Sequence, residues 1–329
     1  MNSQASQAAE SSTCDVSIII VTFHTRDITC ACLQSIYGYP HECEYEVIVI
    51  DNGSNDGSSE MIARQFSKVQ LIVNRDNKGF AAANNQGMKI ARGRYLLLLN
   101  SDTEVNAETL KSTLDFADHN PDIAVIGCRA FDKAGTQQST LFRGIRLQDV
   151  ALNVLIPNNL IRRSNILARR RYPGINLDLV QQVEVVAGCF MFVRRQAWEQ
   201  VGPMYEGFFM YGEEADWCFR FRRAGWRVSY FPGARILHHG NVSSAKCPDE
   251  MSVEMAKSQL LLLQRTQGRV VACIANVLML LRDLPRAIFW RIVSRMSKPR
   301  SIQLRQALRR SSERCSLHAR GLLRTDWGA

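Results

Sequence analysis

The stretch Tyr95-Leu96-Leu97-Leu98-Leu99-Asn100-Ser101-Asp102 decides the fold of this chain. Its apolar run predicts a buried strand of a parallel sheet, and the polar triplet predicts a loop at the carboxyl end of that strand. Ligands of parallel sheets bind just outside the carboxyl ends of the strands, so a carboxylate at Asp102 suits a metal-bound phosphate. Asn, Ser and Asp are also ordinary turn residues after a strand. The triplet therefore takes its meaning from the sequence around it.

Two apolar runs upstream end in polar residues in the same way. They occupy residues 16–22 and 46–51, and the second continues into Asn52-Gly53-Ser54-Asn55-Asp56-Gly57. Segments with a helical pattern follow them, at residues 26–37 and 58–66. Alternation of strand and helix is typical of βα units. The first third of the chain therefore predicts an α/β fold with a doubly wound, mainly parallel sheet flanked by helices.

The pattern of short elements continues beyond the first sheet strands. Asn77-Lys78-Gly79-Phe80 opens a predicted helix rich in small residues, which let the backbone come close to a ligand. The later segments predict strands at 124–127, 183–193 and 227–231, helices at 195–201 and 215–224, and amphipathic helices beyond Met251.

An acidic cluster lies in the second half of the chain. Tyr211-Gly212-Glu213-Glu214-Ala215-Asp216-Trp217 contains three carboxylates in four positions, and His238-His239 follows. Crowded carboxylates raise one another's pKa, which can tune a general base. Acids also gather at helix N-termini because of the helix dipole, which accounts for at least one of the three. Together with Asp102, this set can hold a metal and move a proton.

The net charge of +10 is concentrated in two segments, residues 143–171 and the tail from about 265 to 324. Both segments mix Arg with large apolar residues. We find no zinc pattern, no RNP-type aromatic run and no basic helix without large apolar residues, so we expect no nucleic-acid partner. An anionic membrane surface suits the mixture better, and dimerisation or packing of the tail is the alternative. The apolar run at 270–281 is shorter than the roughly 20 residues of a spanning helix.

The chain is expected to have three parts. Residues 1–14 are small and polar, without the basic start and apolar core of a secretion signal, and predict a disordered leader. Residues 15–250 form the α/β domain with a basic insert at about 141–176, and residues 251–329 form a basic, amphipathic helical tail. Ten scattered cysteines without a C-x-x-C pair fit a reduced, cytoplasmic compartment.

In combination and in this order, the quoted motifs resemble those of the nucleotide-sugar-dependent glycosyltransferases of family 2, and within them the bacterial rhamnosyltransferase-like branch. The resemblance covers residues 16 to about 244. It implies the GT-A fold and an inverting, metal-dependent transfer of a sugar, first of all rhamnose. The implied donor is activated by UDP or dTDP. The implied acceptor is a lipid-linked or growing saccharide of cell-surface polysaccharide, at the inner face of the cell membrane.

The resemblance also implies the metal ligands. Asp102 matches the last acid of the D-x-D-like motif of the family, and His238 matches a metal-ligating histidine, although His239 beside it leaves the choice open. The cation would be Mg²⁺ or Mn²⁺, since hard divalent cations on a diphosphate prefer oxygen ligands and tolerate imidazole. This sequence departs from the motif at Asn100, where many relatives carry Asp, so that position brings no charge.

Donor and catalytic residues are carried over in the same way. Asp51 matches the position that reads the pyrimidine base, although a helix cap or an Asx turn would also explain it. Glu214 matches the catalytic base, with Glu213 as its rival. The remaining matched positions are Thr22, Asn77, Gly79, Asn84 and Ser101 for the donor nucleotide, and Glu213 and Asp216 for positioning the helix start or binding the acceptor. Trp217 and Trp226 are expected in the core, where Trp217 could also wall the acceptor site.

Two other classes of protein compete with this interpretation. A sugar-nucleotide-forming transferase should carry a Gly-rich loop with Arg and Lys after the first strand, whereas Phe23-His24-Thr25-Arg26 stands there. A basic scaffold on a membrane would have no use for Asp102 or the acidic cluster. Metal-independent behaviour that is indifferent to nucleotides would favour the scaffold.

Overall fold

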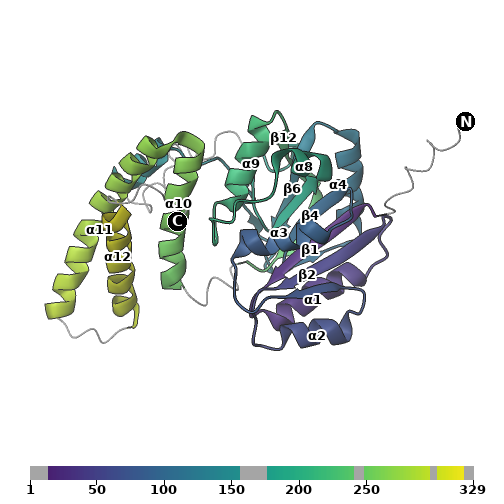
Figure 1. Ribbon diagram of the computed structural model, residues 1–329, viewed down its shortest axis with the longest axis horizontal. Helices are drawn as coiled ribbons and strands as arrows, with labels where there is room; N and C mark the ends of the chain where they lie inside the picture. Colours follow the sequence, from purple (N-terminus) through teal and green to yellow (C-terminus); the bar gives the residue numbers. More distant parts are fainter. Residues whose placement is uncertain (1–13, 156–175, 241–247, 297–301, 322–329) are drawn as a thin grey trace, which may run out of the picture.

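The structure is a computed structural model that describes residues 14–155, 176–240, 248–296 and 302–321. A mixed sheet lies between two layers of helices, and three long C-terminal helices stand beside it (Figure 1). The predicted leader lies outside the described residues, apart from Cys14. So does the part of the basic insert from 156 to 175.

The main sheet has the strand order β3-β2-β1-β4-β11-β6-β12-β5. Six strands share one direction: β1 (Val16–Thr22), β2 (Tyr45–Asp51), β3 (Gln70–Val73), β4 (Tyr95–Asn100), β6 (Ile123–Phe131) and β12 (Arg227–His238). Two run against them, β5 (Thr103–Val105) and β11 (Phe190–Arg194). The predicted α/β fold with a mainly parallel sheet is therefore confirmed. The remaining strands are short: β7 (Gln137–Gln138) and β9 (Gln181–Gln182) pair with the main sheet, and β8 (Leu141–Phe142) pairs with β10 (Val185–Val186).

Alternate residues of the central strands pack on opposite faces of the sheet, as the pleat requires. Ile18 and Ile20 contribute to one apolar core, and Ile19 contributes to the other. The first face is covered by α1 (Arg26–Tyr37), α2 (Ser58–Gln65) and α4 (Ala107–His119), and the second by α3 (Phe80–Ile90), α8 (Arg195–Val201) and α9 (Glu213–Arg223). Burial on both faces explains why these strands are apolar throughout.

Two predicted strands differ from the structure. The expected strand at 183–193 is broken into β10 and β11, because the chain between them changes partner sheets. Ala187 donates its N–H to Thr140 near the small sheet, whereas the carbonyl of Cys189 accepts from Asn100 of the main sheet. The expected short strand at 227–231 continues to His238 as β12, with a bulge between Phe231 and Arg235. Pro232 and Gly233 suggest a strand end, but bulges accommodate such residues.

The tail is helical, in α10 (Pro248–Gln267), α11 (Arg269–Met296) and α12 (Ile302–Gly321). A third apolar core joins α10 and α11 to α5 (Leu147–Leu155) and to Phe208 in the loop before α9. Within the described residues, no helix combines the length and the apolar character needed to cross a membrane.

Candidate active site

The ends of β4 and β12 bring Asp102 and His238 together. Strand β12 pairs with β5 so that His238 lies opposite Thr103, which follows Asp102 directly. As a result, Nε2 of His238 is 3.4 Å from Oδ1 of Asp102. Both side chains are largely buried, and the carboxylate and the imidazole face one another. The two residues that the family resemblance names as metal ligands therefore share one place in the fold.

Gln138 on β7 fixes the tautomer of His238. Its Nε2 donates to the backbone carbonyl of His238 at 2.8 Å, and its Oε1 lies 2.7 Å from Nδ1 of the same residue. Since the carbonyl can only accept, the amide oxygen must face the ring, and Nδ1 must carry the proton. The lone pair of the neutral ring is then on Nε2, the atom facing Asp102. A second hydrogen bond of this kind is typical of metal-ligating histidines.

His239 has a different environment. Its Nε2 lies 2.6 Å from Oε1 of Glu104, and its backbone N–H donates to the carbonyl of Asp102. The geometry therefore favours His238 over His239 beside Asp102. Among the described residues, no cluster of three or more His, Cys, Asp or Glu side chains could hold a metal. A cation at this position would have two protein ligands, an arrangement that leaves coordination positions for phosphate oxygens or water.

The loop before α9 packs against the start of α3. Gly79, with a φ of +82°, precedes α3, and a Cβ there would lie 2.5 Å from the carbonyl oxygen of Phe209. That same oxygen accepts the N–H of Phe80. Tyr211 has a φ of +70°, an uncommon value for a residue with a side chain. The positions before α9 are thus held in unusual backbone conformations that fix where the acids lie.

Glu213 and Glu214 begin α9 in an apolar setting. Burial raises the pKa of both carboxyl groups, and the neighbouring charges of Glu214 and Glu254 raise the pKa of Glu213 further. Glu213 is 4% exposed, and its buried Oε2 has no hydrogen-bond partner among the residues that the structure describes. Glu214 is half-buried, and its Oε2 accepts the N–H of Gly212 at 3.1 Å. Of the pair, Glu214 is the more exposed residue.

Cys189 lies beside the end of β4, where its carbonyl accepts the N–H of Asn100. Burial raises the pKa of its thiol to about 12, and the negative charges of Asp102 and Glu214 contribute to the shift. The two carboxylates belong to different elements, the loop after β4 and the start of α9.

Asp216 is engaged elsewhere. Its carboxylate pairs with Arg220 on the next turn of α9 at 3.0 Å and with Arg265 of α10 at 2.7 Å. The residue is 1% exposed. The structure therefore does not bring Asp216 together with Glu214 at an open surface, and its predicted place among the catalytic residues stays a prediction.

The predicted donor residues Asp51, Thr22 and Ser101 lie at the carboxyl ends of neighbouring strands. Asp51 accepts the N–H of Ser54 through Oδ1 and the hydroxyl of Ser59 through Oδ2, so its side chain holds the loop between β2 and α2. Thr22 and Ser101 each contact the hydroxyl of Thr25. Their roles toward a nucleotide stay predictions.

Amide side chains hold the loop that contains Asn77. Asn52 donates to Oδ1 of Asn77 at 2.8 Å, and its own Oδ1 accepts from Nδ2 of Asn74 and from the backbone of Lys78. Asn84 is 1% exposed and donates to the carbonyl of Phe80 within α3. The predicted residues Asn77, Gly79 and Asn84 thus shape the backbone at the start of α3, beside the loop that carries Phe209.

The family model of glycosyl transferase family 2 matches residues 17–202. The chain belongs to this family. This glycosyltransferase is 26% identical over 244 residues to the N-acetylglucosaminyl-diphospho-decaprenol L-rhamnosyltransferase of Mycobacterium tuberculosis. That alignment covers 68% of this chain and 76% of the relative. The family predicted from the sequence motifs is confirmed.

Solved structures show the same fold. The mannosyltransferase PcManGT of Pyrobaculum calidifontis, solved with GDP-Man and Mn²⁺, has a TM-score of 0.52 at 12% identity, covering 95% of this chain and 90% of its own. GalNAc-T7, solved with UDP, GalNAc and Mn²⁺, has a TM-score of 0.55 at 15% identity, covering 77% of this chain and 48% of its own. The predicted GT-A fold of this glycosyltransferase is confirmed.

Sequence reasoning missed three residues around the site. Gln138 lies on a strand of two residues, too short to give a periodic signal. Asn52 and Asn74 could have been noted as two of several amides near strand ends, but their bond to one another and the bond from Asn52 to Asn77 could not. The core prediction for Trp217 is confirmed, since it is fully buried and donates its indole N–H to Gly202, whereas Trp226 is only partly buried.

Proposed function

We propose that this glycosyltransferase transfers a sugar from a UDP- or dTDP-activated donor to a saccharide acceptor in cell-surface polysaccharide biosynthesis. The observation that carries the proposal is the 3.4 Å approach of Nε2 of His238 to Oδ1 of Asp102, at the carboxyl end of β4. The rhamnosyltransferase relative supports rhamnose as the first donor sugar to test and a lipid-linked acceptor.

Asp102 and Nε2 of His238 would hold a divalent cation, Mg²⁺ or Mn²⁺. A carboxylate with one imidazole suits Mn²⁺ well, and Gln138 leaves the lone pair of His238 on the atom that faces Asp102. The cation supplies stabilisation of the negative charge that develops on the departing nucleoside diphosphate. Asn100 contributes no charge, so the affinity for the cation depends on the phosphates of the donor.

Glu214 acts as the general base in this proposal. It accepts the proton of an acceptor hydroxyl as that oxygen forms its bond to the anomeric carbon and the bond from this carbon to the diphosphate breaks. A single displacement inverts the configuration and needs no covalent nucleophile. The hydrogen bond from Gly212 orients the carboxylate, and burial brings its pKa closer to neutrality. Glu213 remains the rival base, although it is almost fully buried.

The tail is proposed to lie on the inner face of the cell membrane. Helix α11 has a stripe of exposed apolar residues spaced three or four apart, namely Val270, Ile274, Val277, Leu281, Leu284, Ile288 and Ile292. The exposed residues Arg269, Arg286 and Arg291 accompany it, and the one acid of α11, Asp283, is buried against Arg282, Arg314 and His318. Such a helix suits an anionic lipid surface.

A thermal-shift panel tests the donor proposal. The purified protein is melted with UDP, dTDP, GDP and CMP, each with and without Mn²⁺, because a ligand that binds the folded state raises the melting temperature. We expect a Mn²⁺-dependent rise with UDP or dTDP that is lost in Asp102→Ala. A folded protein that responds to none of the four nucleotides would instead favour the membrane scaffold.

A further inference from the structure

A cavity of about 270 Å³ lies where the three helices of the tail meet, beside the sheet in Figure 1. Its lining is strongly basic, with three guanidinium groups, one carboxylate, two hydroxyls and one indole. The residues are Ser252 on α10, Asp283, Arg286 and Trp290 on α11, and Arg310, Ser311 and Arg314 on α12. None of them belongs to the candidate active site, so the cavity is a separate feature of the tail.

Asp283 is the one acid in this lining, and several cations already share its charge. Its Oδ1 lies 2.8 Å from Nε of Arg282 and 3.6 Å from Nη1 of Arg286. Its Oδ2 lies 3.0 Å from Nη2 of Arg314 and 3.5 Å from Nε2 of His318. Even with a neutral His318, three guanidinium groups around one buried carboxylate leave an excess of two positive charges. Such charges repel one another more strongly in a partly buried place than in water.

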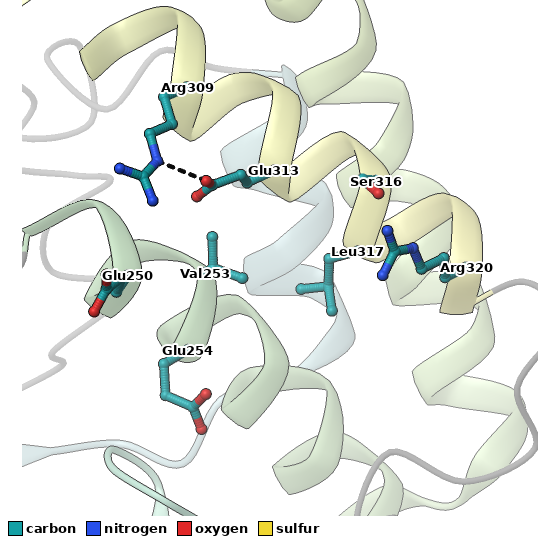
Figure 2. A pocket seen from close by; sticks show the side chains of 8 residues that line it. All are labelled: Glu250, Val253, Glu254, Arg309, Glu313, Ser316, Leu317 and Arg320. Carbon is teal, nitrogen blue, oxygen red and sulfur yellow. Dashed lines mark hydrogen bonds and ion pairs between the residues drawn. The ribbon is translucent and has the colours of Figure 1, made fainter.

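The other acids of the tail that the structure describes lie elsewhere. Glu313 is the only acid of α12, and Figure 2 shows it turned toward Arg309, with which it pairs at 2.7 Å. Glu250 and Glu254 of α10 line the same, different cavity as this pair. Among these described side chains, Asp283 is therefore the only acid in the lining of the basic cavity.

A phosphate group has the charge and the acceptors that the basic cavity lacks. It carries about −1.5 to −2 near neutral pH, which matches the excess positive charge, and it offers three acceptor oxygens. Guanidinium groups bind phosphate through two parallel hydrogen bonds. The hydroxyls of Ser252 and Ser311 can donate as well, and Trp290 offers apolar surface to the organic part of a phosphate ester.

We propose that the basic cavity between α10, α11 and α12 binds a phosphate group through Arg286, Arg310 and Arg314. The phosphate belongs to a soluble phosphate ester or to the headgroup of an anionic lipid, and its chemistry in the cavity is the same in both. Bound there, it bridges the arginines of α11 and α12 and so stabilises the packing of the tail. The site does not depend on sugar transfer, because the three tail helices alone form it.

The test measures the melting temperature of the full-length protein against inorganic phosphate and glycerol 3-phosphate. Ionic strength is held constant with NaCl, and EDTA prevents binding of phosphate through a metal. Ser311→Glu places a carboxylate in the cavity, and Ser312→Glu makes the same change at the next, exposed position of α12. Arg286→Gln removes one guanidinium group, and Arg291→Gln is its control at another exposed position of α11.

Co-sedimentation with vesicles tests the lipid source. The vesicles are phosphatidylcholine with phosphatidic acid, or with oleate at matched surface charge as an anion without phosphate. All four variants are compared with the wild type on both kinds of vesicle.

With a soluble source, phosphate or its ester should raise the melting temperature of the wild type and of both controls. The half-saturating concentration should rise about tenfold or more in Ser311→Glu and Arg286→Gln. Without ligand, Ser311→Glu should melt at a higher temperature than Ser312→Glu, because its carboxylate takes the place of the phosphate.

With a lipid source, the soluble phosphates leave the melting temperature unchanged. The wild type and both controls then prefer phosphatidic acid to oleate, and the two cavity variants lose that preference. The proposal is overturned if the wild type responds to neither source, or if the cavity variants respond as their controls do.

Discussion

Glu213 and Glu214 differ in exposure and therefore in expected role. Replacing Glu214 by Gln removes the proton acceptor while preserving shape, so we expect a loss of sugar transfer of about 10²- to 10⁴-fold. The nucleotide-dependent rise in melting temperature should stay close to that of the wild type. Glu213→Gln serves as the comparison, with a smaller loss. Full activity in Glu214→Gln together with a dead Glu213→Gln would reverse the assignment.

The raised pKa of these carboxyl groups gives a pH dependence with a definite sign. A general base must be deprotonated, so transfer is lost as the pH falls through the pKa of Glu214. Burial raises that pKa, and the acid limb should therefore lie above the value of about 4.3 for an ordinary glutamate. The measurement is kcat/KM against pH at saturating Mn²⁺. An acid limb at or below the ordinary value would contradict the assignment of a buried carboxylate as base.

Gln138 is expected to affect metal affinity through His238, without contacting the metal itself. In Gln138→Leu, the ring of His238 loses the partner that holds the proton on Nδ1, so we expect the Mn²⁺ concentration for half-maximal activity to rise about 10- to 100-fold. Gln137→Leu, on the same short strand, is the matched control. Equal Mn²⁺ requirements in the two variants would show that the orientation of His238 does not depend on Gln138.

At the scale of elements, Asp216 joins α9 to α10. Its buried carboxylate pairs with Arg265 of α10 as well as with Arg220 of its own helix. Arg265→Ala removes one of the two arginines that pair with the buried carboxylate of Asp216. We expect the free energy of unfolding to fall by about 3 kcal/mol. Thermal or urea unfolding measures this change. If Asp216 is structural, the folded fraction of the variant should keep its rate of transfer at low temperature, whereas a proportional loss of rate would support a catalytic role.

The elements that could be predicted from the sequence are those in which successive residues have the same environment. The runs 16–22, 46–51 and 95–99 are buried on both faces, so their apolar character alone identified strands. The break at Gly188 could not be predicted in this way, because it depends on a change of partner sheet that only the tertiary fold decides. His238 was predicted through the family resemblance, whereas Gln138 acts through a partner 100 positions away in the chain.

At the scale of the whole molecule, the helical tail packs against the α/β domain near α9. Helix α10 contributes Arg265 to the ion pair with Asp216 and Ser258 to a hydrogen bond with the carbonyl of Met210, so the tail packs on the element that carries Glu214. Helix α11 lies farther from the sheet, as Figure 1 shows, and presents its apolar stripe to the outside.

The proposed membrane contact of the apolar stripe on α11 can be tested by a single substitution that introduces a charge. Ile288→Glu places a carboxylate in the middle of exposed apolar residues near Arg286 and Arg291, and it opposes both insertion into lipid and attraction to it. We expect binding to vesicles containing anionic lipid to fall about tenfold, measured by co-sedimentation at low and physiological salt. Ile90→Glu on α3 makes the same change at a similarly exposed position away from the stripe. If both variants bind as the wild type does, while Ile288→Glu alone dissociates an oligomer in solution, then a second copy of the chain covers α11.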